Sequence, residues 1–282
     1  MKRFWIMGMA LLLIACADQT ENEQSDAVEK EDEEVELEVD EGEEGDSHLS
    51  KQDDEIEGTD PEDEMTNEEE EIEQVYEINT ANWAVEPIEG EDVEEQVVLL
   101  TIDDAPHTYG VEMAHILADL DVPAIFFVNG HFINDEEGEQ ELKEIHELGF
   151  EIGNHTMSHP NLSEITEEEQ MEEIVKLNER IEEIIGERPR FFRAPFGENT
   201  DFSNQVVATE QMTRMNWTYG YDWVADYQNA ESLADIMVNA PELNNGANLL
   251  MHDREWTKDA LEEIVAGLRD KGYQFVDPEQ IK

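Results

Sequence analysis

The sequence VVLLTIDD at residues 97–104 joins a run of apolar residues to two adjacent carboxylates. The run from Val97 to Ile102 is typical of a buried strand, because it is short, apolar and rich in β-branched residues. Asp103 and Asp104 follow at its end. Adjacent carboxylates repel each other there, which indicates a nearby cation or proton. The alternative is that these aspartates cap the next helix.

Outward from this stretch, apolar strands and amphipathic helices alternate up to the C-terminus. Strands separated by helices favour a parallel sheet covered by helices. About seven strands favour a distorted, incomplete (β/α) barrel of parallel strands. Besides 97–102, the predicted strands are 124–128, 150–153, 190–193, 212–217, 248–251 and 273–276. The predicted helices are 109–120, 137–148, 167–185, 258–271 and two segments near Asn204 and Leu233.

Polar side chains follow several of these predicted strands directly. His155, Arg193, Asp222 and His252 each come shortly after an apolar segment. In such barrels the chemistry lies on loops after the carboxyl ends of strands. We therefore expect these side chains to lie close to Asp103 and Asp104 at the rim of the barrel where the strands have their carboxyl ends.

The sequence HTMSH at residues 155–159 carries two histidines four positions apart. Such residues share one face of a helix and can also meet across a tight turn. With one carboxylate, His155 and His159 would form a ligand set for zinc or another divalent first-row metal. The alternatives are two surface histidines, or an iron oxygenase site with the same ligands.

Two further segments carry groups suited to stabilising charge or transferring a proton. Arg193 can hold a carboxylate in a bidentate fork and keep it ionised. Pro195 and Gly197 favour a turn whose N–H groups could face an oxyanion. His252 could donate a proton. The alternative for residues 193–197 is a plain connecting turn. The alternative for His252 is a capping or core histidine.

Five ordered segments resemble the motifs of a known family. TIDDAP at 101–106 resembles TFDDGP, HTMSH at 155–159 resembles H-[ST]-x-x-H, and RAPFG at 193–197 resembles R-x-P-[YF]-G. Asp222-Trp223 resembles the DW motif, and LMH at 250–252 resembles L-x-H. From Val97 to Val276 the chain therefore resembles the polysaccharide deacetylases of carbohydrate esterase family 4, the NodB homology domain.

The resemblance implies a NodB-like fold and a role for each motif residue. Asp103 would be the general base, oriented by Arg193, and His252 the general acid, tuned by Asp222. The implied metal ligands are Asp104, His155 and His159; the implied substrate contacts are the Phe196 backbone N–H, Trp223 and Leu250. Zinc is the expected cofactor, with cobalt or nickel as alternatives.

The resemblance also implies an activity, the hydrolysis of N-acetyl groups on a polysaccharide. Peptidoglycan N-acetylglucosamine is the favoured substrate because of the expected location outside the cell. The alternatives are an inactive glycan-binding lipoprotein and an O-acetyl esterase of the xylan type. Two residues depart from the family's pattern. Ile102 replaces Phe, and Ala105 replaces Gly, which would cost about 1 kcal/mol if that position required a positive φ.

The N-terminus predicts export and lipidation. Lys2 and Arg3 precede an apolar run at residues 4–15. That run is shorter than the roughly 20 residues of a membrane-spanning helix and suits a signal peptide. The sequence LIAC at 13–16 resembles a lipobox, so we expect a lipoprotein signal peptide with its lipobox at residues 1–16, cleaved to leave Cys16 as the first mature residue. Lipidation of Cys16 would tether the protein to the outer face of the membrane. An ordinary signal peptide with an incidental cysteine is the alternative.

The remaining sequence divides into an acidic linker and one domain. Residues 17–75 are rich in Asp and Glu and lack aromatic residues up to Gln74, which predicts a disordered spacer. Residues 76–282 form the predicted catalytic domain, expected to be a monomer. The net charge is −59, which argues against nucleic acid and anionic lipid surfaces as partners.

Overall fold

The computed structural model describes residues 72–282. The predicted signal peptide, Cys16 and nearly all of the predicted linker lie outside these residues. The strands are β1 (Tyr76–Ile78), β2 (Val85–Pro87), β3 (Val97–Ala105), β4 (Ala124–Val128), β5 (Glu151–Asn154), β6 (Phe191–Phe192), β7 (Thr213–Arg214), β8 (Ala247–His252) and β9 (Gln274–Phe275). The α-helices are α1 (Gly110–Asp119), α2 (Glu136–Glu147), α3 (Glu167–Ile185), α4 (Asp201–Thr209), α5 (Ala230–Asn239) and α6 (Glu255–Asp270).

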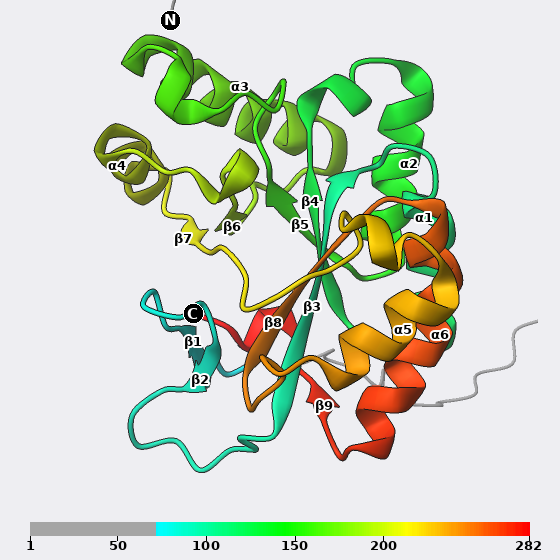
Figure 1. The fold of residues 1–282 in the computed structure, drawn as a ribbon. Helices are drawn as coiled ribbons and strands as arrows, with labels where there is room; N and C mark the ends of the chain where they lie inside the picture. Colours follow the sequence, from blue (N-terminus) through cyan, green and yellow to red (C-terminus); the bar gives the residue numbers. More distant parts are fainter. Residues whose placement is uncertain (1–71) are drawn as a thin grey trace, which may run out of the picture. The chain divides into compact units, whose positions relative to one another are not determined.

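The central sheet has seven parallel strands in the order β7-β6-β5-β4-β3-β8, with β9 paired to the beginning of β3. Helices α1, α2, α5 and α6 lie along one side of this sheet (Figure 1). A single bridge between Tyr219 and Leu249 joins the segment after β7 to β8, so the sheet curls toward closure with little regular pairing there. The prediction of a distorted, incomplete barrel of about seven parallel strands is confirmed.

Successive side chains of the strands point to opposite faces of the sheet, and two separate apolar clusters lie on these faces. In β3, Val98, Leu100 and Ile102 belong to the larger cluster, which includes residues of the covering helices. Val97 and Leu99 belong to a second cluster with Phe127 of β4. Since successive side chains point to opposite faces, Thr101 and Asp103 continue the row of Val97 and Leu99. This alternation turns Asp103 toward the concave side of the sheet.

A hairpin that the sequence did not predict precedes the barrel. β1 and β2 pair antiparallel, and Tyr76 also bridges Ile281 near the C-terminus. The Val85 N–H donates to the carbonyl of Gly246, just before β8. Tyr76 and Val85 pack in the same cluster as Val97 of β3. The hairpin thus adds apolar cover where β3 begins.

Most predicted elements are present, with differences in length. α3 has the predicted bounds because Thr166 and Glu169 form a capping box and Gly186 ends the helix at a φ of 84°. β6 and β7 pair regularly over two residues each, so the predicted strands 190–193 and 212–217 were too long. Among residues 72–282, no helix has the length and apolar composition needed to cross a membrane.

Candidate active site

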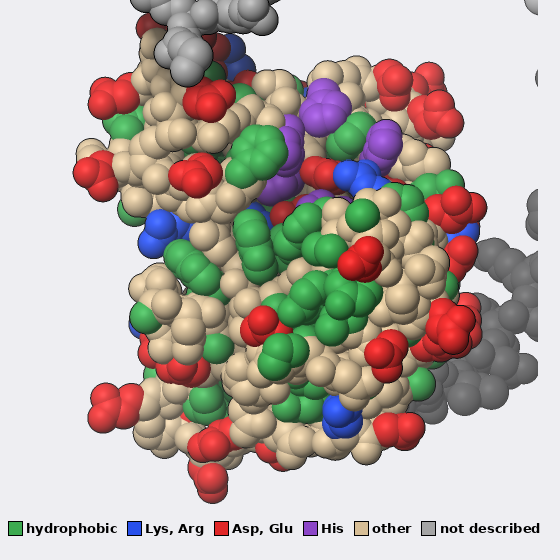
Figure 2. All heavy atoms as spheres, in the orientation of Figure 1, with side chains coloured by type: hydrophobic (Ala, Val, Ile, Leu, Met, Phe, Trp, Pro, Cys, Tyr) green, Lys and Arg blue, Asp and Glu red, His purple; other side chains and the backbone are tan. Residues whose placement is uncertain are grey.

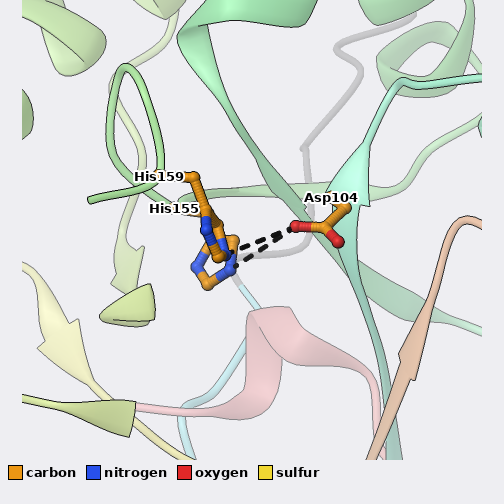
Figure 3. Close-up of side chains that lie close together, drawn as sticks. All are labelled: Asp104, His155 and His159. Atoms are coloured by element: carbon orange, nitrogen blue, oxygen red, sulfur yellow. Dashed lines mark ion pairs between the residues drawn. The ribbon is translucent and has the colours of Figure 1, made fainter. Parts of the chain in front are cut away.

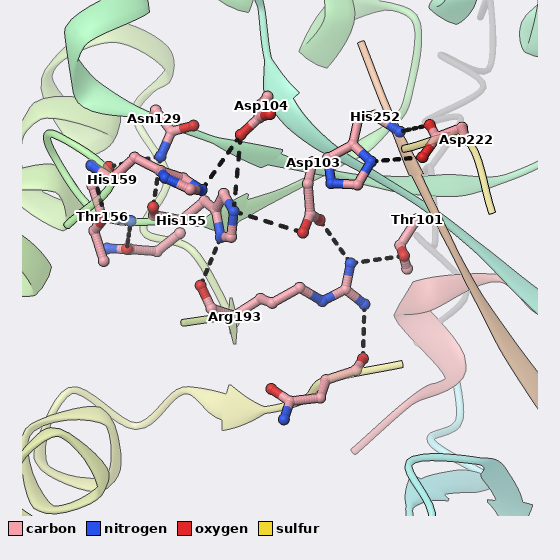
Figure 4. Close-up of polar contacts among 12 residues, drawn as sticks. Thr101, Asp103, Asp104, Asn129, His155, Thr156, His159, Arg193, Asp222 and His252 are labelled. Carbon is pink, nitrogen blue, oxygen red and sulfur yellow. Dashed lines mark hydrogen bonds and ion pairs between the residues drawn. The ribbon is translucent and has the colours of Figure 1, made fainter. Parts of the chain in front are cut away.

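The predicted site residues gather at the carboxyl ends of the parallel strands. Asp103 and Asp104 lie near the end of β3, and His252 is the last residue of β8. His155 follows β5, and Arg193 follows β6. Figure 4 shows that side chains from these four strands point toward one another. The barrel therefore brings together residues that are far apart in the sequence.

Asp104, His155 and His159 form a cluster that could hold a metal ion. One ligand atom from each residue lies within 4.8 Å of the other two (Figure 3). Asp104 Oδ1 is 4.0 Å from His155 Nε2 and 3.6 Å from His159 Nε2. His155 Nδ1 is 2.7 Å from the carbonyl oxygen of Arg193, which fixes a tautomer with Nε2 free to bind a cation. This donor set fits a divalent metal with coordination positions left open.

The two histidines meet across a tight loop and not on a helix. Thr156 and His159 have φ values of 71° and 59°, which non-glycine residues adopt at a cost. Asn129 Nδ2 donates to the carbonyl of His155, and Asn154 Oδ1 accepts from the N–H of Thr156. Buried amides on the neighbouring strands thus hold the loop in its strained conformation.

Glu173 of α3 binds the other side of this loop. Its carboxylate accepts from the Ser158 N–H over 2.8 Å and from the Ser158 hydroxyl over 2.6 Å. Its carbonyl oxygen accepts from the N–H of Met157. Glu173 therefore restrains the segment that leads directly into His159.

Arg193 is fully buried and holds Asp103. Its Nη1 donates to Asp103 Oδ1 over 2.6 Å and to Thr101 Oγ1 over 2.7 Å. The guanidinium lies over the ring of Phe127, with 4.3 Å between its central carbon and the ring centroid. Burial lowers the pKa of Arg193 from its ordinary value, although Asp103 opposes this effect. The pair places a buried carboxylate against a cation and joins them by a charge-assisted hydrogen bond.

His252 and Asp222 form a second charged pair. His252 Nδ1 is 2.8 Å from Asp222 Oδ1, and the His252 N–H donates to Oδ2 over 2.6 Å. Thr257 also donates to Oδ2, over 2.9 Å. Burial alone would lower the pKa of His252, but the hydrogen bond and charge of Asp222, aided by Asp103 and Asp104, raise it above its ordinary value. The arrangement favours a protonated ring near neutral pH.

Two residues of the candidate metal cluster, His159 and Asp104, have pKa values lowered from their ordinary values. Burial and the neighbouring His155 lower the pKa of His159, which favours the neutral ring that binds metal. For Asp104, burial alone would raise the pKa. The nearby His155, His252, His159 and Arg254 outweigh this effect and lower it, which favours the carboxylate.

A cavity of about 480 Å³ joins these groups. Figure 2 shows this hollow, with histidine, acidic and apolar side chains around it. Every predicted site residue within the described part of the chain lines the cavity, except Arg193, which lies beneath Asp103. The exposed rings of Phe196 and Trp223 are 63% and 47% accessible, so both can contact a ligand from solvent.

Several residues at the site were not predicted as functional from the sequence. Trp217 and Arg254 also line the cavity. The Asp253 carboxylate accepts from the N–H groups of residues 107–110 and so orders the loop after β3. Asp253 could have been found from its place beside His252. Arg254 and Trp217 gave no signal, because no motif includes them and only the fold brings them to the cavity.

Comparison with known proteins identifies the family. The family model "Polysaccharide deacetylase" matches residues 90–215. The solved structure of peptidoglycan deacetylase PdaC from Bacillus subtilis is 30% identical to this chain, with a TM-score of 0.59. That match covers 67% of this chain and 91% of the PdaC chain. The chain belongs to the polysaccharide deacetylase family. The resemblance predicted from the five motifs is thereby confirmed.

Two Bacillus proteins also match by sequence. The uncharacterised protein YlxY of Bacillus subtilis is 33% identical over 190 residues, which cover 67% of this chain and 58% of YlxY. The peptidoglycan-N-acetylglucosamine deacetylase of Bacillus cereus is 33% identical over 187 residues, which cover 64% of this chain and 66% of that enzyme. The chain thus spans less than two thirds of the length of either relative.

Inactive members share this family fold. BA3943 from Bacillus anthracis, described as a pseudoenzyme of carbohydrate esterase family 4, is 26% identical to this chain with a TM-score of 0.61. The match covers 67% of each chain. A BA3943 mutant with restored enzymatic activity is 28% identical, also with a TM-score of 0.61. The family fold therefore occurs in both active and inactive proteins, and the inference of activity depends on the residues of the site.

Proposed function

We propose that this protein is a metal-dependent hydrolase that removes N-acetyl groups from a glycan, with peptidoglycan N-acetylglucosamine as its favoured substrate. The proposal depends on one cavity in which a candidate metal site, a candidate general base and a candidate general acid lie together. It is lined by the Asp104, His155 and His159 cluster, by Asp103 held on Arg193, and by His252 held on Asp222. A metal-dependent amide hydrolase would use each of these groups, as metal site, general base and general acid.

The residues divide the reaction between two proton transfers. A divalent metal, when bound, would polarise the acetamido carbonyl and lower the pKa of a bound water. Asp103, held in place by Arg193, would accept the proton of the attacking water. His252, kept protonated by Asp222, would protonate the departing sugar nitrogen, because an amine anion is a very poor leaving group.

The remaining residues would hold the acetyl group and its oxyanion. Phe196 has a φ of 60° in the turn after β6, and its backbone N–H is the proposed oxyanion donor. Trp223 packs edge-on against His252, with ring centroids 5.4 Å apart. Trp223 and Leu250 are the proposed walls of the acetyl pocket, beside the proposed acid.

The choice of substrate draws on relatives and on the proposed location. The Bacillus cereus relative is named as a peptidoglycan-N-acetylglucosamine deacetylase and PdaC as a peptidoglycan-N-acetylmuramic acid deacetylase, so both support peptidoglycan and the first supports N-acetylglucosamine. We also propose that Cys16 is lipidated after cleavage of the signal peptide, that residues 17–75 act as a spacer and that the protein is a monomer. Replacing Cys16 with Ala should move the protein out of the membrane fraction. A Cys16→Ala variant that stays membrane-bound would contradict the anchor.

An inactive glycan-binding protein is the second candidate, because BA3943 is a pseudoenzyme on the same fold. Only Ala105 favoured this reading in the sequence. In the structure the positive φ belongs to Asp104, at 62°, and Ala105 is a buried residue at the end of β3. Ala105 therefore adopts no positive φ, which supports an active site in this protein. The proposed ligands, base and acid all line the cavity.

Acetate release from defined substrates tests the proposal. The full chain, stripped of metal and reloaded with zinc, should release acetate from purified peptidoglycan. Asp103→Asn should reduce the rate at least about 100-fold. Asp119→Asn, an exposed site on α1, is the matched control and should leave the rate unchanged. Acetate only from acetylated xylan would favour the O-acetyl esterase. No acetate from peptidoglycan, N-acetylated chito-oligosaccharides or xylan would favour the inactive protein.

A further inference from the structure

Arg254 lies at the metal cluster although no motif contains it. It precedes α6 as the N-cap residue, two positions after His252. Its Nη2 donates to Asp104 Oδ2 over 3.1 Å, and its Nη1 donates to the carbonyl of Asp253 over 3.0 Å. The side chain is 36% exposed and lines the same cavity as the proposed catalytic groups.

The two carboxylate oxygens of Asp104 have different neighbours. Oδ1 faces the Nε2 atoms of His155 and His159, at 4.0 and 3.6 Å. Oδ2 is bonded to Arg254. If the carboxylate turned to give both oxygens to one cation, it would lose its charge-assisted bond to Arg254. The pair therefore favours coordination through Oδ1 alone.

Arg254 is itself fixed relative to Asp104 by the residue between it and His252. The Asp253 carboxylate accepts four backbone N–H bonds from residues 107–110, the loop that follows β3. The Asp253 N–H donates to the carbonyl of Asp103 over 3.1 Å. The end of β8 is thus tied to both sides of Asp104. The backbone of Arg254 is therefore held beside Asp104, and the bond from Nη1 to the Asp253 carbonyl restrains the guanidinium.

We propose that Arg254 is a positioning residue that holds Oδ2 of Asp104, so that the carboxylate presents only Oδ1 to the metal. The inference rests on the proposed function, because it concerns the metal of that site. A carboxylate that binds through one oxygen leaves coordination positions for water and the acetamido carbonyl. Outer partners of metal ligands tune affinity or activity by about 10- to 100-fold. Arg254 would contribute to turnover in this way without touching the substrate.

Cobalt binding by the full chain tests the proposal without requiring turnover. The visible spectrum of bound Co²⁺ reports coordination number, because six-coordinate cobalt absorbs more weakly than four- or five-coordinate cobalt. Arg254→Gln should weaken the cobalt bands, since the freed carboxylate can bind through both oxygens. Arg254→Lys retains a donor for Oδ2 and should keep the wild-type spectrum. Arg269→Gln, near the far end of α6, is the matched control and should leave the spectrum unchanged.

Kinetics separate this role from a role in substrate binding. With zinc, Arg254→Gln should lower kcat about 10- to 100-fold with little change in KM, and Arg254→Lys should recover part of the loss. An Arg254→Gln protein with the wild-type cobalt spectrum and zinc affinity would overturn the proposal, even if its activity fell. If the wild type released no acetate, the proposed function would fail, but the cobalt comparison would still decide the role of Arg254.

Discussion

Arg193 and Asp103 form a buried ion pair at the base of the cavity, with 2.6 Å between Nη1 and Oδ1. Both side chains are almost inaccessible to solvent, so each depends on the other for its charge to be tolerated. The pair fixes the position of the Asp103 side chain on the concave face of the sheet. It also connects the RAPFG motif, which contains Arg193, to the TIDDAP motif, which contains Asp103.

Replacing Arg193 with Met should destabilise the fold, because it removes the arginine partner of the buried Asp103 carboxylate and leaves it only His155 Nε2, 3.5 Å away. We expect a loss of about 3–5 kcal/mol in the free energy of unfolding, measured by urea denaturation. The control is Arg188→Met, which removes an arginine paired with Glu182 and Glu210 near the surface and should cost less than about 1 kcal/mol. Equal losses in the two variants would contradict a special role for the buried pair.

Replacing Asp222 with Asn should change the pH dependence of turnover. Asp222 raises the pKa of His252, so the protonated acid persists to higher pH and activity falls as the pH rises through that pKa. Removing the carboxylate charge lowers the pKa, and the alkaline limb of kcat/KM should move to lower pH. Asp226→Asn, an exposed aspartate in the same loop, should leave the limb in place. If the alkaline limb of kcat/KM stayed at the same pH in Asp222→Asn, His252 would not be the general acid.

Replacing Glu173 with Ala should weaken metal binding, although Glu173 is outside the metal cluster. The change removes both bonds to Ser158 that restrain the loop before His159. We expect zinc affinity, measured by competition with a chromophoric chelator, to fall about 10-fold. The neighbouring Glu172 is ion-paired with Lys176 on the helix surface, so Glu172→Ala is a matched control. The loop restraint would be refuted if both variants bound zinc equally well.

Replacing Ala105 with Gly should not improve the protein, although the family usually has Gly there. The left-handed conformation belongs to Asp104, so glycine relieves no strain at residue 105. We expect Ala105→Gly to lower the free energy of unfolding by about 0.5–1 kcal/mol, because glycine gains more freedom in the unfolded chain. Thermal unfolding and acetate release would measure this. A large gain in activity would show that Ala105 restricts the site.

The sequence predicted the barrel and the proposed site for identifiable physical reasons. Buried parallel strands such as residues 97–102 are continuous apolar runs, and functional groups follow their carboxyl ends. The predicted strands 190–193 and 212–217 were too long because apolar runs do not report where strand pairing ends. The strained loop around Thr156 depends on Asn129 and Glu173, which are distant in sequence. Arg254 reaches Asp104 only through the pairing of β8 with β3, which no local pattern encodes.

Asp104, His155 and His159 are expected to bind one divalent cation together. Anomalous X-ray scattering at the zinc edge, from crystals of the full chain grown with zinc, would locate that cation. We expect one strong peak bounded by Asp104 Oδ1, His155 Nε2 and His159 Nε2, which is absent from His159→Ala crystals. A peak elsewhere in the molecule, or none at this cluster with zinc in excess, would contradict it.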